Sequence, residues 1–298
     1  MRNKDLVEGI ADYIQNNFEF GNILGEPIFP KQGMSSLVFF LNFESGLELV
    51  IKYGEAVDKD FHFLNILKEN NSKLPVPKVY GYFELEGKHI LLLEKINGKH
   101  FGEVELEDLS KYFETVLENF NELHKIVKEG VEWKKYLQNI FNEGTINWKE
   151  VLERKNLEKV LLELSLNKIS EKINNLNFKG INFSLLHTDF NQNNLFVEST
   201  AFKIVGIVDW EEATFGDSVY DFARFHLHLW HREVSKKEVD DFLKMLNLNE
   251  EEKIRERIYF LSFIIHYLAY YSESENDFNF ERIKMHQEYL SNVDWELV

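Results

Sequence analysis

The chain has 298 residues, of which 44% are hydrophobic and 14% aromatic, and this is enough to form a sizeable core in one large domain or two lobes. It contains no cysteine, which excludes disulfides, thiolate metal sites and a cysteine nucleophile. The net charge of −17 argues against binding to nucleic acid or anionic membranes and favours cationic ligands. The first residues lack a signal-peptide core and no apolar run reaches about 18 residues, so we expect a cytoplasmic protein.

The first hundred residues show mainly strand patterns, with a single predicted helix. Residues 58–70 place apolar side chains at helical spacing, and Glu86-Gly87 is typical of a hairpin turn between two strands. Apolar and alternating runs predict five strands, over residues 29–33, 37–43, 47–53, 79–85 and 89–94. All four prolines lie within the first 77 residues, and the pattern changes after them.

From residue 105 the patterns are mostly helical. Apolar periodicity predicts helices over residues 109–127, 133–141, 148–164 and 168–174, and again from 219 to the end. Shorter strand patterns occur at residues 183–186, 195–197 and 202–208. We therefore predict an α+β protein with a small β-rich N-terminal lobe, residues 1–96, and a large, mainly helical C-terminal lobe, residues 97–298.

The strongest signal for chemistry is a polar loop between two apolar strands. His187 and Asp189 follow the first strand, Asn194 precedes the second, and the next strand ends at Asp209. Phosphoryl transfer needs a positioned hydroxyl and neutralised phosphate charge, and Mg²⁺ prefers hard oxygen ligands. One aspartate to accept a proton, with an amide and a second carboxylate for Mg²⁺, would meet both needs. A plain polar turn would explain the loop, but not the second aspartate that ends the next strand.

These residues carry a family resemblance. The motif H-x-D-x-x-x-x-N, the strand that ends in Asp, and G-D-x-x-Y-D-x-A at residues 216–223 together resemble the aminoglycoside phosphotransferase family. The resemblance covers nearly the whole chain. It implies a protein-kinase-like two-lobe fold and transfer of the γ-phosphate of ATP or GTP, with Mg²⁺, to a hydroxyl of a small molecule. The roles it implies are Asp189 as catalytic base, Asn194 and Asp209 as Mg²⁺ ligands, and His187 and Asp221 as supports of the loop.

The resemblance also implies a nucleotide site in the N-terminal lobe. Lys52 ends the strand LELVIKY and matches the lysine that contacts the α- and β-phosphates. Asp60 stands where the family has the glutamate partner of that lysine. Because Asp is one methylene shorter, Glu55 and Asp58 remain alternative partners. The other implied nucleotide contacts are a phosphate loop at Gly33, Met34, Ser35 and Ser36, and hinge backbone groups from Glu94 to Ile96.

The acceptor pocket is expected in the residues after the catalytic loop, where acidic and aromatic side chains gather. Carboxylates beside aromatic faces suit an ammonium-bearing ligand, so an aminoglycoside is the first hypothesis. A macrolide, choline or ethanolamine, and a sugar such as methylthioribose stay open, because the motifs do not separate them. The candidate acceptor residues are Glu211, Glu212, Trp230, His231, Tyr267 and Tyr271.

Two interpretations of another class have less support. A nucleotide-binding pseudokinase would lack part of the catalytic set, which is complete here. A zinc hydrolase would need clustered ligands, but the ten histidines are scattered and no H-E-x-x-H occurs. Glu211 replaces the glycine of protein kinases and no A-P-E element follows, so we expect a small-molecule substrate and not a protein. A monomer is the default expectation, and the choice between ATP and GTP is left open.

Overall fold

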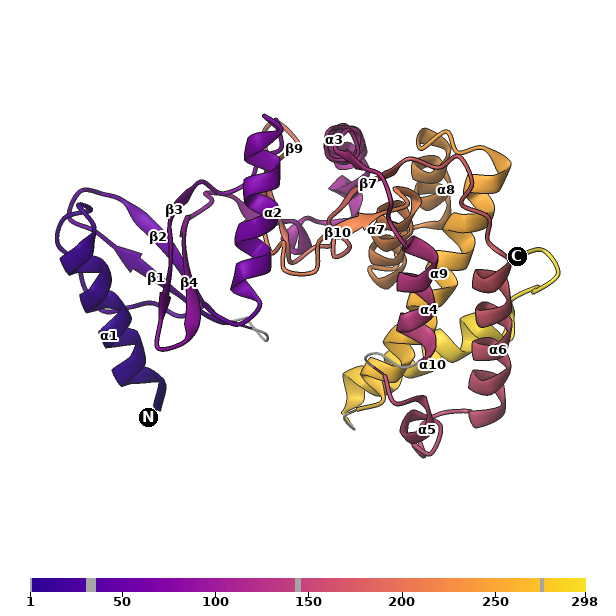
Figure 1. Ribbon diagram of the computed structural model, residues 1–298. Coiled ribbons are helices and arrows are strands. Elements are labelled where there is room, and N and C mark those ends of the chain that lie inside the picture. The colour runs from indigo at the N-terminus through magenta and orange to yellow at the C-terminus, as the bar shows by residue number, and fades with distance from the viewer. Residues whose placement is uncertain (1, 31–35, 143–145, 274–275) are drawn as a thin grey trace. The chain divides into compact units, whose positions relative to one another are not determined.

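The computed structural model describes residues 2–30, 36–142, 146–273 and 276–298, and the chain forms two compact units. The first unit contains residues 1–104 and 192–213, and the second contains residues 105–191 and 214–298. Residues 97–104 and 192–213, predicted from the sequence to lie in the helical lobe, thus belong to the β-rich unit. Figure 1 labels most of the helices and strands of each unit.

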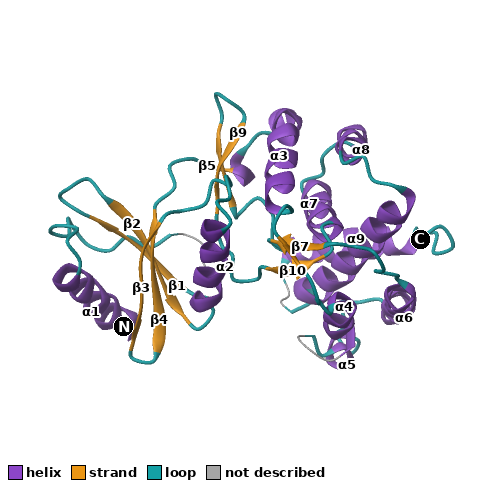
Figure 2. Ribbon diagram, turned by 45° about the horizontal axis from the view of Figure 1, so that its top comes forward, coloured by secondary structure: helices purple, strands orange, loops and turns teal. Residues whose placement is uncertain are grey.

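The first unit is built on a four-stranded antiparallel sheet with a helix on each face (Figures 1 and 2). In the strand order β1-β2-β4-β3, Leu49 and Ile51 of β2 face the helix α1 and form a core with its Ile10 and Ile14. Side chains alternate along a strand, so Lys52 points to the opposite face, where α2 lies. The elements are α1 (Arg2–Asn17), β1 (Leu37–Asn42), β2 (Glu48–Gly54), α2 (Val57–Glu69), β3 (Val79–Leu85) and β4 (Lys88–Glu94).

A second, three-stranded sheet completes the first unit and explains why a late segment of the chain belongs to it. Its strand order is β5-β8-β9, so residues near 100 pair with residues near 197. Ile207 N donates to Pro75 O at 2.7 Å, and Ile96 packs on Gly206 so closely that a Cβ there would lie 2.5 Å from Cγ2 of Ile96. The elements are β5 (Lys99–His100), η1 (Phe101–Glu103), β8 (Leu195–Glu198) and β9 (Lys203–Ile207).

The second unit is mainly helical and has α9 at its centre. α7, α10 and α6 pack on α9, which explains why this 22-residue helix carries apolar residues on most sides from Ile258 onward. A small sheet of order β10-β7-β6 lies beside the helices. None of the described helices is long and apolar enough to span a membrane. The elements are η2 (Leu106–Tyr112), α3 (Phe113–Leu123), β6 (Val127–Lys128), α4 (Trp133–Asn142), α5 (Trp148–Val151), α6 (Lys159–Asn175), β7 (Phe183–Leu186), β10 (Thr214–Gly216), α7 (Val219–His231), α8 (Lys236–Met245), α9 (Glu250–Tyr271) and α10 (Asp277–Ser291).

The prediction of a single helix in the first hundred residues is wrong, because α1 precedes the sheet. Val7, Ile10 and Ile14 of α1 are buried and recur at helical spacing, a signal that the sequence does contain. The first predicted strand, 29–33, is not a strand over its described residues. Ile28 makes an isolated bridge to Phe40, and residues 31–33 lie outside the described part of the chain.

Two long predicted helices are divided in the structure. The segment 109–127 contains the end of a 3₁₀ helix, then α3, and it ends in the short strand β6. The segment 148–164 holds α5, a break, and the start of α6, which runs on through the separately predicted helix 168–174. Arg154 lies in this break and donates to Ala269 O and Ser272 Oγ at 2.8 and 2.6 Å. A contact with a helix more than a hundred residues away thus accompanies the break.

Candidate active site

In the first unit, Lys52 forms a buried ion pair with Asp60. The Lys52 Nζ atom lies 2.6 Å from Oδ2 of Asp60, whose side chain is 1% exposed. The other carboxylate oxygen of Asp60 accepts a hydrogen bond from Trp210 N at 3.1 Å. Of the three candidate partners, the structure thus places Asp60 on Lys52, despite its shorter side chain. Asp58 instead accepts from Lys59 N at the start of α2.

Lys52 also reaches the segment that follows β9. Its Nζ lies 2.7 Å from Oδ1 of Asp209 and 3.9 Å from Oε2 of Glu211. Burial alone would lower the pKa of Lys52, but the charges of Asp60 and Asp209 outweigh it and raise the pKa above its usual value. Glu211, predicted as an acceptor residue, thus lies beside Lys52, the lysine predicted to contact the phosphates, while Glu212 is exposed.

Asn194 and Asp209 lie at the same end of the β8–β9 hairpin. Asn194 immediately precedes β8, Asp209 follows β9 by two residues, and Leu195 pairs with Ile207. Val208 N donates to Asn194 O at 3.0 Å, which ties the two segments together. Asp209 has a φ of 70°, a left-handed conformation that is uncommon for residues other than glycine. An amide and a carboxylate oxygen at one hairpin end are suitable ligands for Mg²⁺, which takes one or two protein side chains and completes its shell with phosphates and water.

The remaining predicted nucleotide residues are only partly described. Gly33, Met34 and Ser35 lie outside the described residues, and Ser36 is half-buried beside Gly54. At the predicted hinge, Glu94 N donates to Lys78 O at 2.8 Å. This N–H is thus already used within the protein, and a purine would use other groups of the hinge.

In the second unit, Asp221 holds the backbone of the predicted catalytic loop. This fully buried carboxylate accepts from His187 N at 3.1 Å and Thr188 N at 2.8 Å. His124 Nε2 donates to the same carboxylate at 3.1 Å. Thr188 has a φ of 63°, which is strained for a β-branched residue, so the loop depends on these bonds to keep its shape. His187 is buried as well, and its Nδ1 accepts from Asp189 N at 3.3 Å.

Asp189 itself is held by Arg224, a residue that we did not predict as part of the site. Arg224 Nη2 and Asn191 Nδ2 both donate to Oδ1 of Asp189, at 2.5 and 2.6 Å. Burial would raise the pKa of Asp189, but the Arg224 guanidinium outweighs it and the pKa is lowered below its usual value. The sequence signal that could have revealed this residue is an arginine one turn after Asp221, on the face of α7 that is buried.

The aromatic residues predicted to contact the acceptor form one packed cluster with buried histidines. The Tyr267 hydroxyl accepts from Arg224 Nη2 at 2.5 Å, and the Tyr267 ring lies beside the rings of His231 and Tyr271. His231 Nε2 lies 3.1 Å from His286 Nε2. His286 Nδ1 donates to Arg282 O, so its Nε2 accepts the proton of His231. The rings of these tyrosines and histidines thus contact one another within the protein.

This cluster predicts that acid destabilises the protein. Burial lowers the pKa of His228 to about 3, of His231 to about 2, and of His266 and His286 to about 4. Below pH 6.5 these histidines bind protons in the unfolded chain but stay neutral in the folded chain. The free energy of unfolding therefore falls as the pH drops from 6.5. At pH 5 each such histidine lowers the free energy of unfolding by about 2 kcal/mol. We expect circular dichroism to show a much lower Tm at pH 5.0 than at pH 7.5.

A matched pair of variants tests the assignment of this effect. His266→Gln removes one of the histidines with a lowered pKa and should make the fall in Tm shallower. His100→Gln, which replaces an exposed histidine of the first unit, should leave the pH dependence unchanged. An equal Tm for the wild-type protein at pH 5.0 and 7.5 would contradict the prediction.

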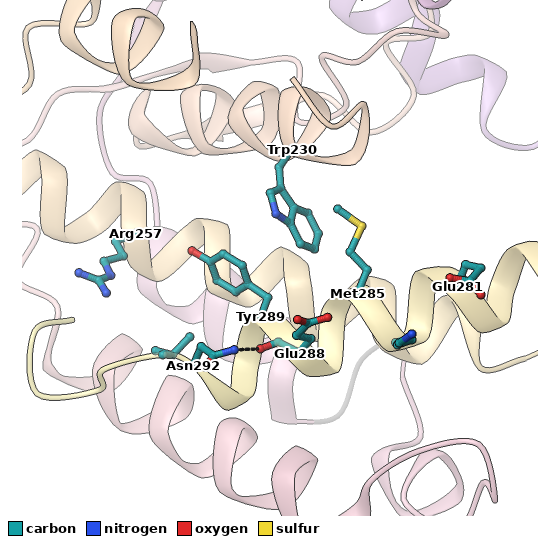
Figure 3. Close-up of a pocket in the computed structure, with 9 residues that line it drawn as sticks. Trp230, Arg257, Glu281, Met285, Glu288, Tyr289 and Asn292 are labelled. Atoms are coloured by element: carbon teal, nitrogen blue, oxygen red, sulfur yellow. Dashed lines mark hydrogen bonds between the residues drawn. The ribbon is translucent and has the colours of Figure 1, made fainter. Parts of the chain in front are cut away.

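Trp230 lines a cavity between helices of the second unit (Figure 3). The cavity has a volume of about 550 Å³, and its walls come from α7, α9, α10 and the residues just after α10. Its charged lining residues are Arg257, Glu281, Lys284 and Glu288. Asp189 and Arg224 are not among the residues that line it, so the structure places Trp230 at a cavity other than the surroundings of Asp189.

Comparison with known proteins identifies the class to which this fold and site belong. The profile of the phosphotransferase enzyme family matches residues 29–257, and the chain belongs to this family. Its fold is the kinase-like, two-lobe fold of the aminoglycoside phosphotransferases, as predicted from the motifs.

Solved structures share this fold over almost the whole chain. A thermostable mutant of aminoglycoside phosphotransferase APH(4)-Ia, in a ternary complex with ADP and hygromycin B, has a TM-score of 0.70 at 16% identity and covers 95% of this chain and 97% of its own. A putative aminoglycoside phosphotransferase from Ralstonia eutropha has a TM-score of 0.65 at 13% identity, with coverage of 95% and 98%. ADP-bound APH(2'')-Ib has a TM-score of 0.61 at 16% identity, with coverage of 97% and 98%.

A curated relative is much longer than this chain. The probable acyl-CoA dehydrogenase IBR3 of Arabidopsis thaliana is 22% identical over an alignment 249 residues long, which covers 71% of this chain. The match takes in 30% of the Arabidopsis protein, so this chain corresponds to less than a third of that relative.

Proposed function

We propose that the protein transfers the γ-phosphate of a nucleoside triphosphate to a hydroxyl of a small molecule. Asp189 accepts the proton of that hydroxyl, Lys52 contacts the nucleotide phosphates, and Asn194 and Asp209 hold Mg²⁺. When bound, the Mg²⁺ ion would neutralise the charge that develops on the phosphates. Membership of the phosphotransferase family supports the reaction class, and the solved complexes with ADP support the use of a nucleotide.

The observation that carries the proposal is the network around Lys52. One ammonium contacts Asp60 from α2 and Asp209 from the end of β9, and Asp209 shares its hairpin end with Asn194. Burying a lysine costs free energy unless it is paired. A lysine that is kept charged beside a metal-type carboxylate is suited to bind phosphates together with a cation. A purely structural ion pair would not need an amide side chain at the same hairpin end.

An aminoglycoside is the first candidate for the acceptor. Support comes from the fold shared with an enzyme solved with hygromycin B and from the net charge of −17, which attracts polycations. Glu211 was predicted to contact a cationic acceptor, but it lies 3.9 Å from Lys52. It therefore adds little support for an ammonium-bearing acceptor. A macrolide, choline or ethanolamine, and a sugar such as methylthioribose remain the alternatives.

A coupled assay of nucleotide consumption tests the function and separates these acceptors. The purified protein with Mg²⁺ and either ATP or GTP is given hygromycin-, kanamycin-, gentamicin- and streptomycin-type compounds, a macrolide, choline, ethanolamine and methylthioribose. We expect acceptor-dependent consumption with at least one aminoglycoside. Consumption only with a sugar or choline would refute the aminoglycoside. If the protein binds nucleotide but does not consume it with any acceptor of the panel, the proposal of a small-molecule kinase fails. The pseudokinase interpretation then gains support.

A further inference from the structure

Arg224 is buried in the second unit, and its charge lies against the proposed catalytic base. Its side chain is 8% exposed, and Nη2 donates to Oδ1 of Asp189 at 2.5 Å. The two residues are 35 positions apart, one in the loop after β7 and the other on α7. A buried arginine is costly unless it is paired, so this contact has a strong effect on both residues.

Side chains from α9 hold Arg224 in place. The Tyr267 hydroxyl accepts from the same Nη2 atom, and the guanidinium carbon lies 5.0 Å from the centre of the Tyr267 ring and 5.5 Å from that of Phe263. A planar guanidinium that is hydrogen-bonded and lies over two aromatic rings has few other orientations open to it. Tyr267 therefore determines where Arg224 donates.

Two side-chain donors reach the same oxygen of Asp189. Arg224 and Asn191 each donate to Oδ1, and this fixes the rotation of the carboxylate about its last bond. The phosphoryl transition state is loose and asks for little basicity, so the orientation of the base matters more than its strength.

We propose that Arg224, held by Tyr267, is a positioning residue that fixes the orientation in which the Asp189 carboxylate takes the proton of the acceptor hydroxyl. In this step the acceptor oxygen forms a bond to the γ-phosphorus while the bond from that phosphorus to the bridging oxygen of the nucleotide breaks. The proton moves to the Asp189 carboxylate and later leaves to solvent. The inference rests on the proposed function, since it assigns Asp189 as the base.

The first test measures Asp189 directly and needs no activity. Protein carrying ¹³C-labelled aspartate carboxyls is titrated by NMR, and the Asp189 signal is assigned with Asp189→Asn. In Arg224→Met, Asp189 stays partly buried but loses its cation, so we expect its titration midpoint to rise by about 1 to 3 pH units. Arg224→Lys should retain most of the wild-type behaviour. Arg232→Met, at the end of the same helix, should leave the midpoint unchanged.

The second test uses kinetics with the acceptor identified by the coupled assay. We expect Arg224→Met to lower kcat about 10- to 100-fold, with KM for the nucleotide unchanged, and to shift the acidic limb of the pH profile upward. Tyr267→Phe keeps the ring but removes the hydroxyl, so it should give a smaller loss in the same direction.

The outcomes separate this inference from the proposed function. An unchanged Asp189 midpoint in Arg224→Met, or wild-type kcat and pH profile in both variants, would overturn the role of Arg224. The wild-type protein could transfer no phosphate while the Asp189 midpoint still rises in Arg224→Met. This result would overturn the proposed function and leave the pairing of Arg224 with Asp189 intact. If Arg224→Met fails to fold, as judged by circular dichroism, the Arg224→Lys and Tyr267→Phe variants still decide the question.

Discussion

Asp189→Asn is expected to lower kcat for phosphoryl transfer about 10²- to 10⁴-fold, the range typical of losing a general base. Asparagine has nearly the same shape but cannot take the proton of the acceptor hydroxyl. Arg224 would lose its anionic partner, so we also expect a lower Tm. The measurements are the coupled assay for kcat and circular dichroism for Tm. Nucleotide binding should persist, and it is measured as the rise in Tm that Mg²⁺ and nucleotide induce.

Asp240→Asn provides the matched control for this substitution. Asp240 lies on α8 of the same unit and has no role in the proposed site. The control variant should keep wild-type kcat and Tm. If Asp189→Asn kept more than a tenth of the wild-type kcat, Asp189 could not be the base.

Asp221→Ala is expected to be the most destabilising single substitution near the proposed site. It would leave three donors without their acceptor: the buried His187 N and Thr188 N, and the partly buried His124 Nε2. Removing a buried, multiply bonded carboxylate typically costs about 3 to 5 kcal/mol. Because Thr188 is held in a left-handed conformation next to Asp189, kcat should fall together with stability. Chemical denaturation measures the first effect and the coupled assay the second.

Asp241→Ala is the matched control for Asp221→Ala. Asp241 makes surface ion pairs with Lys237 and Lys244 on α8, so the variant should unfold close to the wild-type denaturant midpoint. A midpoint for Asp221→Ala equal to that of this control would show that the three bonds to Asp221 do not hold the loop.

Local patterns were sufficient for several strands and turns, including those next to the proposed catalytic residues. The strand 79–85 and its hairpin turn follow from alternation and from Glu86-Gly87, and in the structure both turn residues have positive φ. Strand 183–186 and the order of polar loop, strand, strand and Asp209 are also present as predicted. Neighbouring residues decide these features, so the sequence alone reveals them.

Other features depended on contacts between distant segments. Asp60 lies 2.6 Å from Lys52 only because α2 packs on the sheet face to which Lys52 points. The break between α5 and α6 coincides with the contacts of Arg154 with the end of α9. Helical periodicity could not reveal this break, because a run of helix-forming residues looks the same with or without a distant anchor.

By itself, the sequence determined the family, the kinase-like fold and the reaction class that we propose, because these depend on short motifs with characteristic spacing. Only the tertiary structure decided that Asp60 pairs with Lys52, that Glu211 lies beside this lysine, and that Trp230 lines a separate cavity. It also brought Arg224 onto Asp189, across 35 residues of chain. The physical reason is that a charge finds its partner through the packing of whole elements, and no local pattern encodes that packing.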